Sequence, residues 1–249
     1  MVRPWHRAVA AAIPSSKQGE DPQVPKRALI EKRPWLVASL IAGVSYWLAA
    51  KGHVPGLWLI LWKGAGVALL AAYAWAHHPT RNAHAIAIVM ALGAVGDMVL
   101  ELNFNAGAIA FLLGHLAAIA LYLEFRRDQP SGSQWAAAIA TLLAVPLIAY
   151  QLTARPEVAL YALGLSGMAA AAWLSSFSRY RVGLGAMMFV ASDLLIFARM
   201  GPLAESTIPG LLIWPLYYFG QFLVCTGVIA TLRARGEFDR PGVNSRSAI

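Results

Sequence analysis

The sequence predicts an all-α polytopic membrane protein with eight transmembrane helices. The 249-residue chain is 59% hydrophobic and only 13% charged, about half the charged share of an ordinary soluble domain. Apolar runs close to the 17–25 residues needed to cross a bilayer follow one another along most of the chain. Short polar turns separate the runs, so no stretch is left for a separate soluble domain.

The eight predicted helices make up a single transmembrane domain, residues 34–232. Clear helix breakers mark the first turns, with Pro55 and Gly56 in one and His77, His78 and Pro79 in another. In chain order the predicted helices cover residues 34–50, 57–76, 83–103, 106–124, 135–150, 156–174, 181–198 and 208–232.

The two ends of the chain differ from this domain in composition. Residues 1–33 contain Pro, Lys and Arg and have no apolar run long enough for a signal peptide, which predicts a disordered, basic cytoplasmic tail. Residues 233–249 are similar and predict a second cytoplasmic tail. The single cysteine, Cys225, lies in the last predicted helix and can form no intramolecular disulfide.

Lys and Arg are distributed unevenly between the two sides of the predicted domain. With the amino terminus in the cytoplasm, cytoplasmic segments hold 16 of the 20 basic residues, while the opposite side holds Lys51, Arg155 and Arg199. The positive-inside rule therefore predicts cytoplasmic termini, in a protein of the bacterial cytoplasmic (inner) membrane. The basic residues are not interleaved with aromatic residues, so we expect no nucleic-acid partner.

Two aspartates lie within predicted helices, Asp97 in the third and Asp193 in the seventh. An ionisable side chain in hydrocarbon costs a few kcal/mol and usually faces a polar cavity or a partner. With a rise of 1.5 Å per residue, both aspartates and Lys63 lie about 8–9 Å below the outer boundary. This shared depth predicts one cavity that opens toward the outer side.

Other polar residues near this depth are candidates for substrate binding. Glu101 lies one helical turn above Asp97, and Ser192 precedes Asp193. The remaining candidates, in the fourth and eighth helices, are His115, Tyr217, Tyr218 and Gln221. For each residue the alternative is structural, namely a hydrogen bond between helices or, for Lys63 and Glu101, contact with water at a helix end.

Corresponding helices of the two halves share short patterns. Phe111-x-x-Gly114-His115 in the fourth helix has the same form as Tyr217-x-x-Gly220-Gln221 in the eighth. The hypothesis is two four-helix repeats related by an axis along the membrane normal. The alternative is a chance resemblance in a background rich in Ala and Leu.

Motifs for other chemistries are missing from the sequence. It contains no HExxH, no clustered Cys and His, no Gly-x-Ser-x-Gly and no P-loop. We therefore expect no metal site and no cofactor.

The polar positions resemble those of the lysoplasmalogenase family, the YhhN-like membrane proteins. The resemblance covers roughly residues 57–230 and rests on Lys63, Gly96-Asp97-x-x-Leu100, Gly114-His115, Phe189-x-x-Ser192-Asp193-x-Leu195 and Tyr217-Tyr218-x-x-Gln221. The chain departs from the family at Gly64, where Pro is usual, at Ala118, where a Tyr usually follows the histidine, and in its acidic Glu101. These departures bear on head-group preference more than on fold.

The resemblance implies a membrane hydrolase that cleaves the vinyl-ether bond of lysoplasmalogens. The products would be a fatty aldehyde and glycerophosphoethanolamine or glycerophosphocholine, and the partners a lysophospholipid substrate and membrane lipid. Such a bond is protonated at carbon, and water captures the resulting oxocarbenium ion, so one carboxylic acid and one carboxylate are required. Asp97 and Asp193 can divide these catalytic roles, and Lys63 can hold the substrate phosphate.

Two other classes of function stay open at this point. A transporter or non-catalytic membrane protein also places charges within the membrane, although no Pro interrupts the third and seventh helices near the aspartates. Another intramembrane hydrolase is the second alternative, although an aspartyl protease would have Gly-x-Gly-Asp where this chain has Ala94-Val95-Gly96-Asp97. Nothing in the sequence indicates an oligomeric state.

Overall fold

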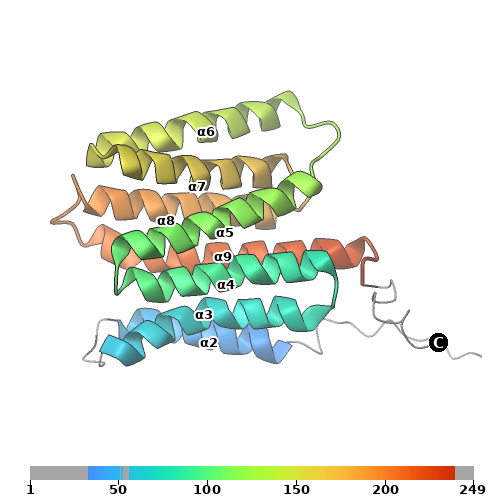
Figure 1. Cartoon of the computed structure of the whole chain (residues 1–249), viewed down its shortest axis with the longest axis horizontal. Coiled ribbons are helices and arrows are strands. Elements are labelled where there is room, and N and C mark those ends of the chain that lie inside the picture. Colours follow the sequence, from blue (N-terminus) through green and yellow to red (C-terminus); the bar gives the residue numbers. More distant parts are fainter. Residues whose placement is uncertain (1–32, 51, 53–55, 239–249) are drawn as a thin grey trace, which may run out of the picture.

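A computed structural model describes the chain at residues 33–50, 52 and 56–238. In this part of the chain, eight long helices form an antiparallel bundle (Figure 1). They are α2 (Arg33–Ala49), α3 (Gly56–His77), α4 (Arg81–Leu100), α5 (Phe104–Glu124), α6 (Gly132–Thr153), α7 (Pro156–Leu174), α8 (Leu184–Arg199) and α9 (Ile208–Ala234). A short π-helix, η1 (Arg179–Gly183), leads into α8.

Each predicted apolar run corresponds to one of these helices, which confirms the all-α fold. Seven of the helices, α3 to α9 with η1 counted as part of α8, are long and apolar enough to cross a membrane, and α2 has 17 residues. Large apolar side chains such as Ile41, Leu143 and Leu147 are exposed on the outside of the bundle. Such a surface suits contact with lipid, so the protein is an integral membrane protein.

Local signals explain where several helices begin. The side chains of Thr80, Asn103 and Ser131 accept hydrogen bonds from the first backbone N–H groups of α4, α5 and α6. Gln134 completes a capping box with Ser131. Pro156 occupies the first turn of α7, where its missing N–H is not needed. These caps keep the connections short and fix the depth of the residues that follow.

The bundle has two ends with different charge. The α4–α5, α6–α7 and α8–α9 connections lie at one end, here called the α4–α5 end, and Arg33 and Ala234 lie at the other, the terminal end (Figure 1). Among the described residues the terminal end carries Arg33, Arg81, Arg126, Arg127, Arg179, Arg181, Arg233 and Arg235, whereas the α4–α5 end carries Arg155 and Arg199. The positive-inside rule predicts that the terminal end is cytoplasmic.

Two helices contain an internal proline, which leaves the carbonyl four residues earlier without its helical partner. In α6 the carbonyl released by Pro146 belongs to Leu142, and the hydroxyl of Ser166 in α7 donates to it at 3.4 Å. In α9 the carbonyl released by Pro215 belongs to Leu211, and the indole N–H of Trp47 in α2 donates to it at 3.2 Å. Neighbouring helices thus satisfy both groups, as a membrane interior requires.

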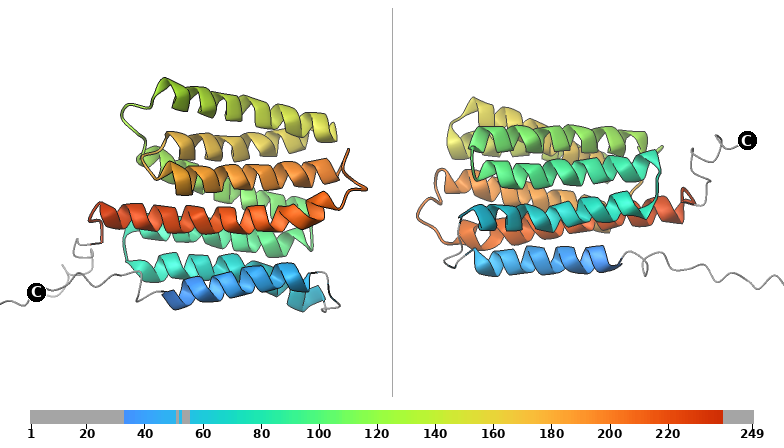
Figure 2. Two further views of the ribbon diagram at one scale, coloured as in Figure 1. Left: turned by 180° about the vertical axis from the view of Figure 1, so that it is seen from behind. Right: turned by 60° about the horizontal axis from the view of Figure 1, so that its bottom comes forward.

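Helix α9 runs through the middle of the bundle, between α8 and the helices α2 to α4 (Figures 1 and 2). Two glycines bring α8 and α9 together. A Cβ atom built on Gly185 would lie 2.6 Å from the carbonyl oxygen of Gly220, and one on Gly220 would lie 2.8 Å from that of Gly185. Only glycines allow backbones to approach so closely, and this contact brings α9 against the helix that carries Asp193.

The proposed four-helix repeat stays a hypothesis. Helix α3 packs along α4 over much of its length, whereas the corresponding pair, α7 and α8, is in much more limited contact. Of the two expected tails, residues 1–32 and 239–249 lie outside the described residues. At the start of the second tail, α9 continues to Ala234, and Glu237 accepts a hydrogen bond of 2.9 Å from the side chain of Asn82 in α4.

The orientation can be tested by cysteine labelling in a Cys225→Ser background. Leu102 is exposed in the α4–α5 connection, and Gln129 is exposed in the α5–α6 connection at the terminal end. We expect a membrane-impermeant maleimide to label Leu102→Cys in intact cells and Gln129→Cys only after permeabilisation. The opposite labelling pattern would mean that the terminal end faces the outer side, contrary to the prediction.

A second experiment tests the glycine contact between α8 and α9. Gly185→Ala places a methyl group against the Gly220 carbonyl and should lower the free energy of unfolding by about 1–3 kcal/mol, the usual cost of overpacking. Gly210→Ala in α9 is the control, since a Cβ atom there meets nothing within 4 Å. Unfolding in detergent would measure both, and equal stability of the two variants would contradict the close contact.

Candidate functional site

A cavity of about 350 Å³ lies at the α4–α5 end of the bundle. Its wall is built from α3, α4, α5, α7, α8 and α9, and most of it is apolar. Of the residues singled out in the sequence, Lys63, Asp97, Ser192, Asp193 and Tyr217 line it. The structure therefore brings both aspartates into one cavity, although they are 96 residues apart in the chain.

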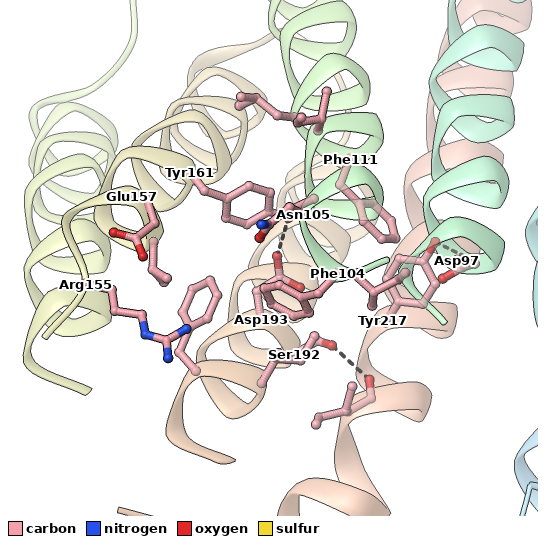
Figure 3. Close-up of a pocket in the computed structure, with 18 of the residues that line it drawn as sticks. Asp97, Phe104, Asn105, Phe111, Arg155, Glu157, Tyr161, Ser192, Asp193 and Tyr217 are labelled. Carbon is pink, nitrogen blue, oxygen red and sulfur yellow. Dashed lines mark hydrogen bonds between the residues drawn. The ribbon is translucent and has the colours of Figure 1, made fainter. Parts of the chain in front are cut away.

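Asp97 lies in α4 and is almost completely buried. The hydroxyl of Tyr217 in α9 donates a hydrogen bond of 2.8 Å to its Oδ2 atom (Figure 3). Gly96 leaves room for this arrangement, because a Cβ atom there would lie 2.9 Å from the ring of Phe111. The carboxyl group is thus held by a single donor from another helix, next to the cavity.

Asp193 lies in α8 and is buried to a similar extent. Its Oδ2 atom accepts a hydrogen bond of 2.8 Å from the hydroxyl of Tyr161 in α7 (Figure 3). The Tyr161 hydroxyl also lies 3.3 Å from Nε2 of His115 in α5. His115, Tyr161 and Asp193, each from a different helix, are therefore linked by successive polar contacts.

Three aromatic rings, which we call the aromatic floor, lie between the cavity and the interior of the bundle. The ring centroids of Phe111 and Phe189 are 5.9 Å apart, and that of Tyr217 lies 5.7 Å from the first and 5.0 Å from the second, all edge to face. Such packing fills space tightly. The two aspartates therefore stand at the boundary between an open cavity and a packed interior.

Lys63 enters the cavity from α3 and forms an ion pair with Glu101, with a distance of 2.5 Å between Nζ and Oε1. The lysine side chain is 12% exposed and the glutamate 44%, so the pair lies near the mouth. Gly64, the next residue, allows α3 to lie close to Met98 of α4. Glu101 is therefore a partner of Lys63 and does not itself line the cavity.

Ser192 lines the cavity, but its hydroxyl donates to the carbonyl of Ile213 at 2.9 Å and so joins α8 to α9. Tyr218 points away from the cavity. Its hydroxyl lies 2.8 Å from that of Ser39, which donates to the carbonyl of Gly66 at 2.6 Å. Tyr218 thus connects α9 with α2 and α3.

His115 and Gln221 lie outside the main cavity. They line a separate space of about 20 Å³ that is also bordered by Phe111 and Phe189. Gln221 nevertheless lies close to the site, because a Cβ atom on Gly93 would be 3.0 Å from its Nε2 atom and 3.4 Å from the Tyr217 hydroxyl. His115 and Gln221 are therefore neighbours of the tyrosines that hold the two aspartates.

Sequence reasoning missed Tyr161, the donor to Asp193. The signal was present, because Tyr161 follows Pro156 by five residues and so lies about 8 Å into its helix, at the depth of the aspartates. The mouth residues Phe104, Arg155 and Glu157 were also missed, whereas Asn105, expected at the mouth because it follows the third predicted helix, does line the cavity. Within the described part of the chain, no three His, Cys, Asp or Glu side chains are grouped to hold a metal ion.

Comparison with known proteins gives one match. A family model described as the YhhN family matches residues 58–228, well over half of the chain. The matched segment contains all of the cavity-lining aspartates and tyrosines. No curated protein and no solved structure matches the chain.

Proposed function

The chain belongs to the YhhN family, and we propose that it is a lysoplasmalogenase-like hydrolase that cleaves the vinyl-ether bond of a lysolipid. We place it in the bacterial cytoplasmic membrane, with the cavity opening toward the outer side. The observation that carries the proposal is the pair of buried aspartates that line one cavity, each held by a tyrosine hydroxyl.

The reaction divides between the two carboxyl groups. One aspartic acid transfers its proton to the vinyl carbon distal to the ether oxygen, which gives an oxocarbenium ion. The other, as a carboxylate, removes a proton from the water that attacks the carbon bonded to oxygen, and a hemiacetal forms. The second aspartate, now protonated, gives its proton to the glycerol oxygen as the hemiacetal carbon–oxygen bond breaks. The hemiacetal hydroxyl returns a proton to the first aspartate, and the aldehyde leaves. The sum is addition of one water, with both aspartates returned to their initial states.

The surroundings suit this chemistry. Tyr161 and Tyr217 fix the orientation of the two carboxyl groups, so a substrate meets them without reorganisation. The aromatic floor keeps water below the cavity away from the oxocarbenium ion. Lys63, on the cavity wall and held by its ion pair with Glu101, supplies a positive charge near the site without binding the substrate phosphate directly.

The alternatives are less well supported. A transporter opens its site to each side in turn, and the edge-to-face packing of Phe111, Phe189 and Tyr217 indicates no path from this cavity toward the terminal end. An aspartyl protease needs two carboxyl groups that share one water and one proton, whereas each aspartate here has its own tyrosine donor. The direct test is aldehyde release by the detergent-purified protein from a lysoplasmalogen, with a saturated 1-alkyl ether as the uncleaved control.

Asp97→Asn and Asp193→Asn should each lower turnover by at least about 100-fold, the scale of general acid–base catalysis. The amide keeps the size and polarity of the side chain, so folding in detergent should be preserved. The double variant should lose much less than the product of the single losses, because the residues act as a unit. Asp128→Asn, at an exposed position of the α5–α6 connection, is the matched control. Near-normal aldehyde release by folded Asp97→Asn or Asp193→Asn would refute the mechanism.

Tyr161→Phe and Tyr217→Phe should lower kcat by about tenfold, a loss near that of one hydrogen bond to a charged group, while KM changes little. Each substitution removes the donor to one carboxyl group and leaves the ring in place. Tyr150→Phe is the control, because that side chain is exposed on α6 and lies away from the cavity. A rise in KM with unchanged kcat would assign the two tyrosines to substrate binding instead.

A further inference from the structure

The mouth of the cavity carries two charged side chains that the proposed chemistry does not use. Arg155 and Glu157 stand at the start of α7, and both are exposed and line the cavity. The two ion pairs found among the described residues, Lys63–Glu101 and Arg81–Glu124, involve neither of them. Figure 3 shows the guanidinium of Arg155 extending from the start of α7 toward α8. A positive and a negative group are thus available for a ligand at the mouth of the cavity.

The height of these charges above the aspartates matches the dimensions of a lysolipid. Tyr161, which holds Asp193, follows Arg155 by six residues, so Arg155 stands about 9 Å higher along α7. In a lysolipid the three glycerol carbons separate the ether oxygen from the phosphate ester. A substrate with its ether at Asp193 therefore holds its phosphate above the aspartates but below the start of α7, and the long side chain of Arg155 can cover the remaining distance.

The side wall below these charges is apolar, and part of it reaches the outer surface of the bundle. Ile109 in α5 and Leu160 in α7 both line the cavity, yet they are 59% and 68% exposed on the surface of the bundle. Leu112 packs against Gly164 farther down, where α5 and α7 come together. Ile109 and Leu160 thus mark a strip between α5 and α7, here called the slot, that belongs both to the cavity wall and to the surface that faces the hydrocarbon of the bilayer.

We propose that this slot is where the lysolipid lies, with Arg155 binding its phosphate and Glu157 the ammonium of its head group. The hydrocarbon chain passes between Ile109 and Leu160 into the bilayer. The assignment deepens the proposed function and rests on it for the identity of the bond that reacts.

The two charges have separate roles in selectivity. A guanidinium binds phosphate oxygens through two parallel N–H donors, so Arg155 favours any phosphate-bearing lipid. A carboxylate attracts an ammonium and repels an additional negative charge, so Glu157 favours a zwitterionic head group over a purely anionic one. Together they select an ethanolamine- or choline-type lysolipid.

The test measures binding of three non-cleavable ligands to the full-length protein in detergent. These are a 1-O-alkylglycerol, its 3-phosphate and its 3-phosphoethanolamine. Arg155→Gln should weaken binding of the two phosphate-bearing ligands about tenfold and leave the alkylglycerol unchanged, in keeping with loss of a charged hydrogen bond. Glu157→Gln should weaken only the phosphoethanolamine ligand, by a few-fold.

Matched controls lie at the same end of the bundle. Arg199→Gln and Glu205→Gln remove exposed charges that do not line the cavity, and they should bind all three ligands like the unmodified protein. Leu160→Trp should obstruct the slot and weaken all three ligands. Leu163→Trp, on the exposed side of the same helix and outside the cavity, should not.

The outcomes separate this inference from the proposed function. The expected binding pattern without aldehyde release from a lysoplasmalogen would refute the hydrolase and leave the lysolipid site in place. Aldehyde release with equal effects of Arg155→Gln and Arg199→Gln on binding would overturn the lysolipid site alone. Failure of the unmodified protein to bind any of the three ligands, or equal losses in Leu160→Trp and Leu163→Trp, would also overturn it.

Discussion

Polar groups within this bundle must find their partners inside the protein, because the surrounding hydrocarbon has no water to offer. Much of the structure follows from that constraint. The carbonyls released by Pro146 and Pro215 accept hydrogen bonds from Ser166 and Trp47 on neighbouring helices. The same requirement applies with more force to a carboxyl group, and both aspartates meet it through a tyrosine from another helix. The site is thus stabilised in the same way as the rest of the bundle, by hydrogen bonds between neighbouring helices.

These partners can meet only where helices approach closely, and glycine supplies the room. Gly185 and Gly220 bring α8 against α9, while Gly93 leaves space for Gln221 and the Tyr217 hydroxyl. Gly43 does the same for the ring of Tyr218, which ties α9 to α2 and α3 through Ser39. In a membrane, helix association depends on such close packing, because burial of apolar surface gives little advantage over lipid. The glycines therefore support the site without contributing a side chain to it.

The cavity combines features that a lipid hydrolase needs in one place. Two acids stand at the boundary of a packed interior, the apolar slot between α5 and α7 reaches the outer surface, and charges of both signs stand at the mouth. An amphiphile can occupy such a cavity with its hydrocarbon chain in the bilayer and its head group at the mouth. A water-soluble substrate would not need an apolar slot that faces the bilayer. The cavity thus supports the proposed class of substrate, a lysolipid.

The sequence by itself determined the helices, their order and the depth of Lys63, Asp97 and Asp193. It could do so because the bilayer sets the length of each span and the helix rise converts residue number into depth. Only the tertiary structure decided that Tyr161 holds Asp193, that Tyr218 faces α2 and α3, and that His115 and Gln221 lie below the aromatic floor. Those facts depend on how each helix is rotated about its axis and which helices are its neighbours. Rotation and neighbours are set by the packing of glycines and aromatic rings between helices, and hydropathy along one helix carries no record of that packing.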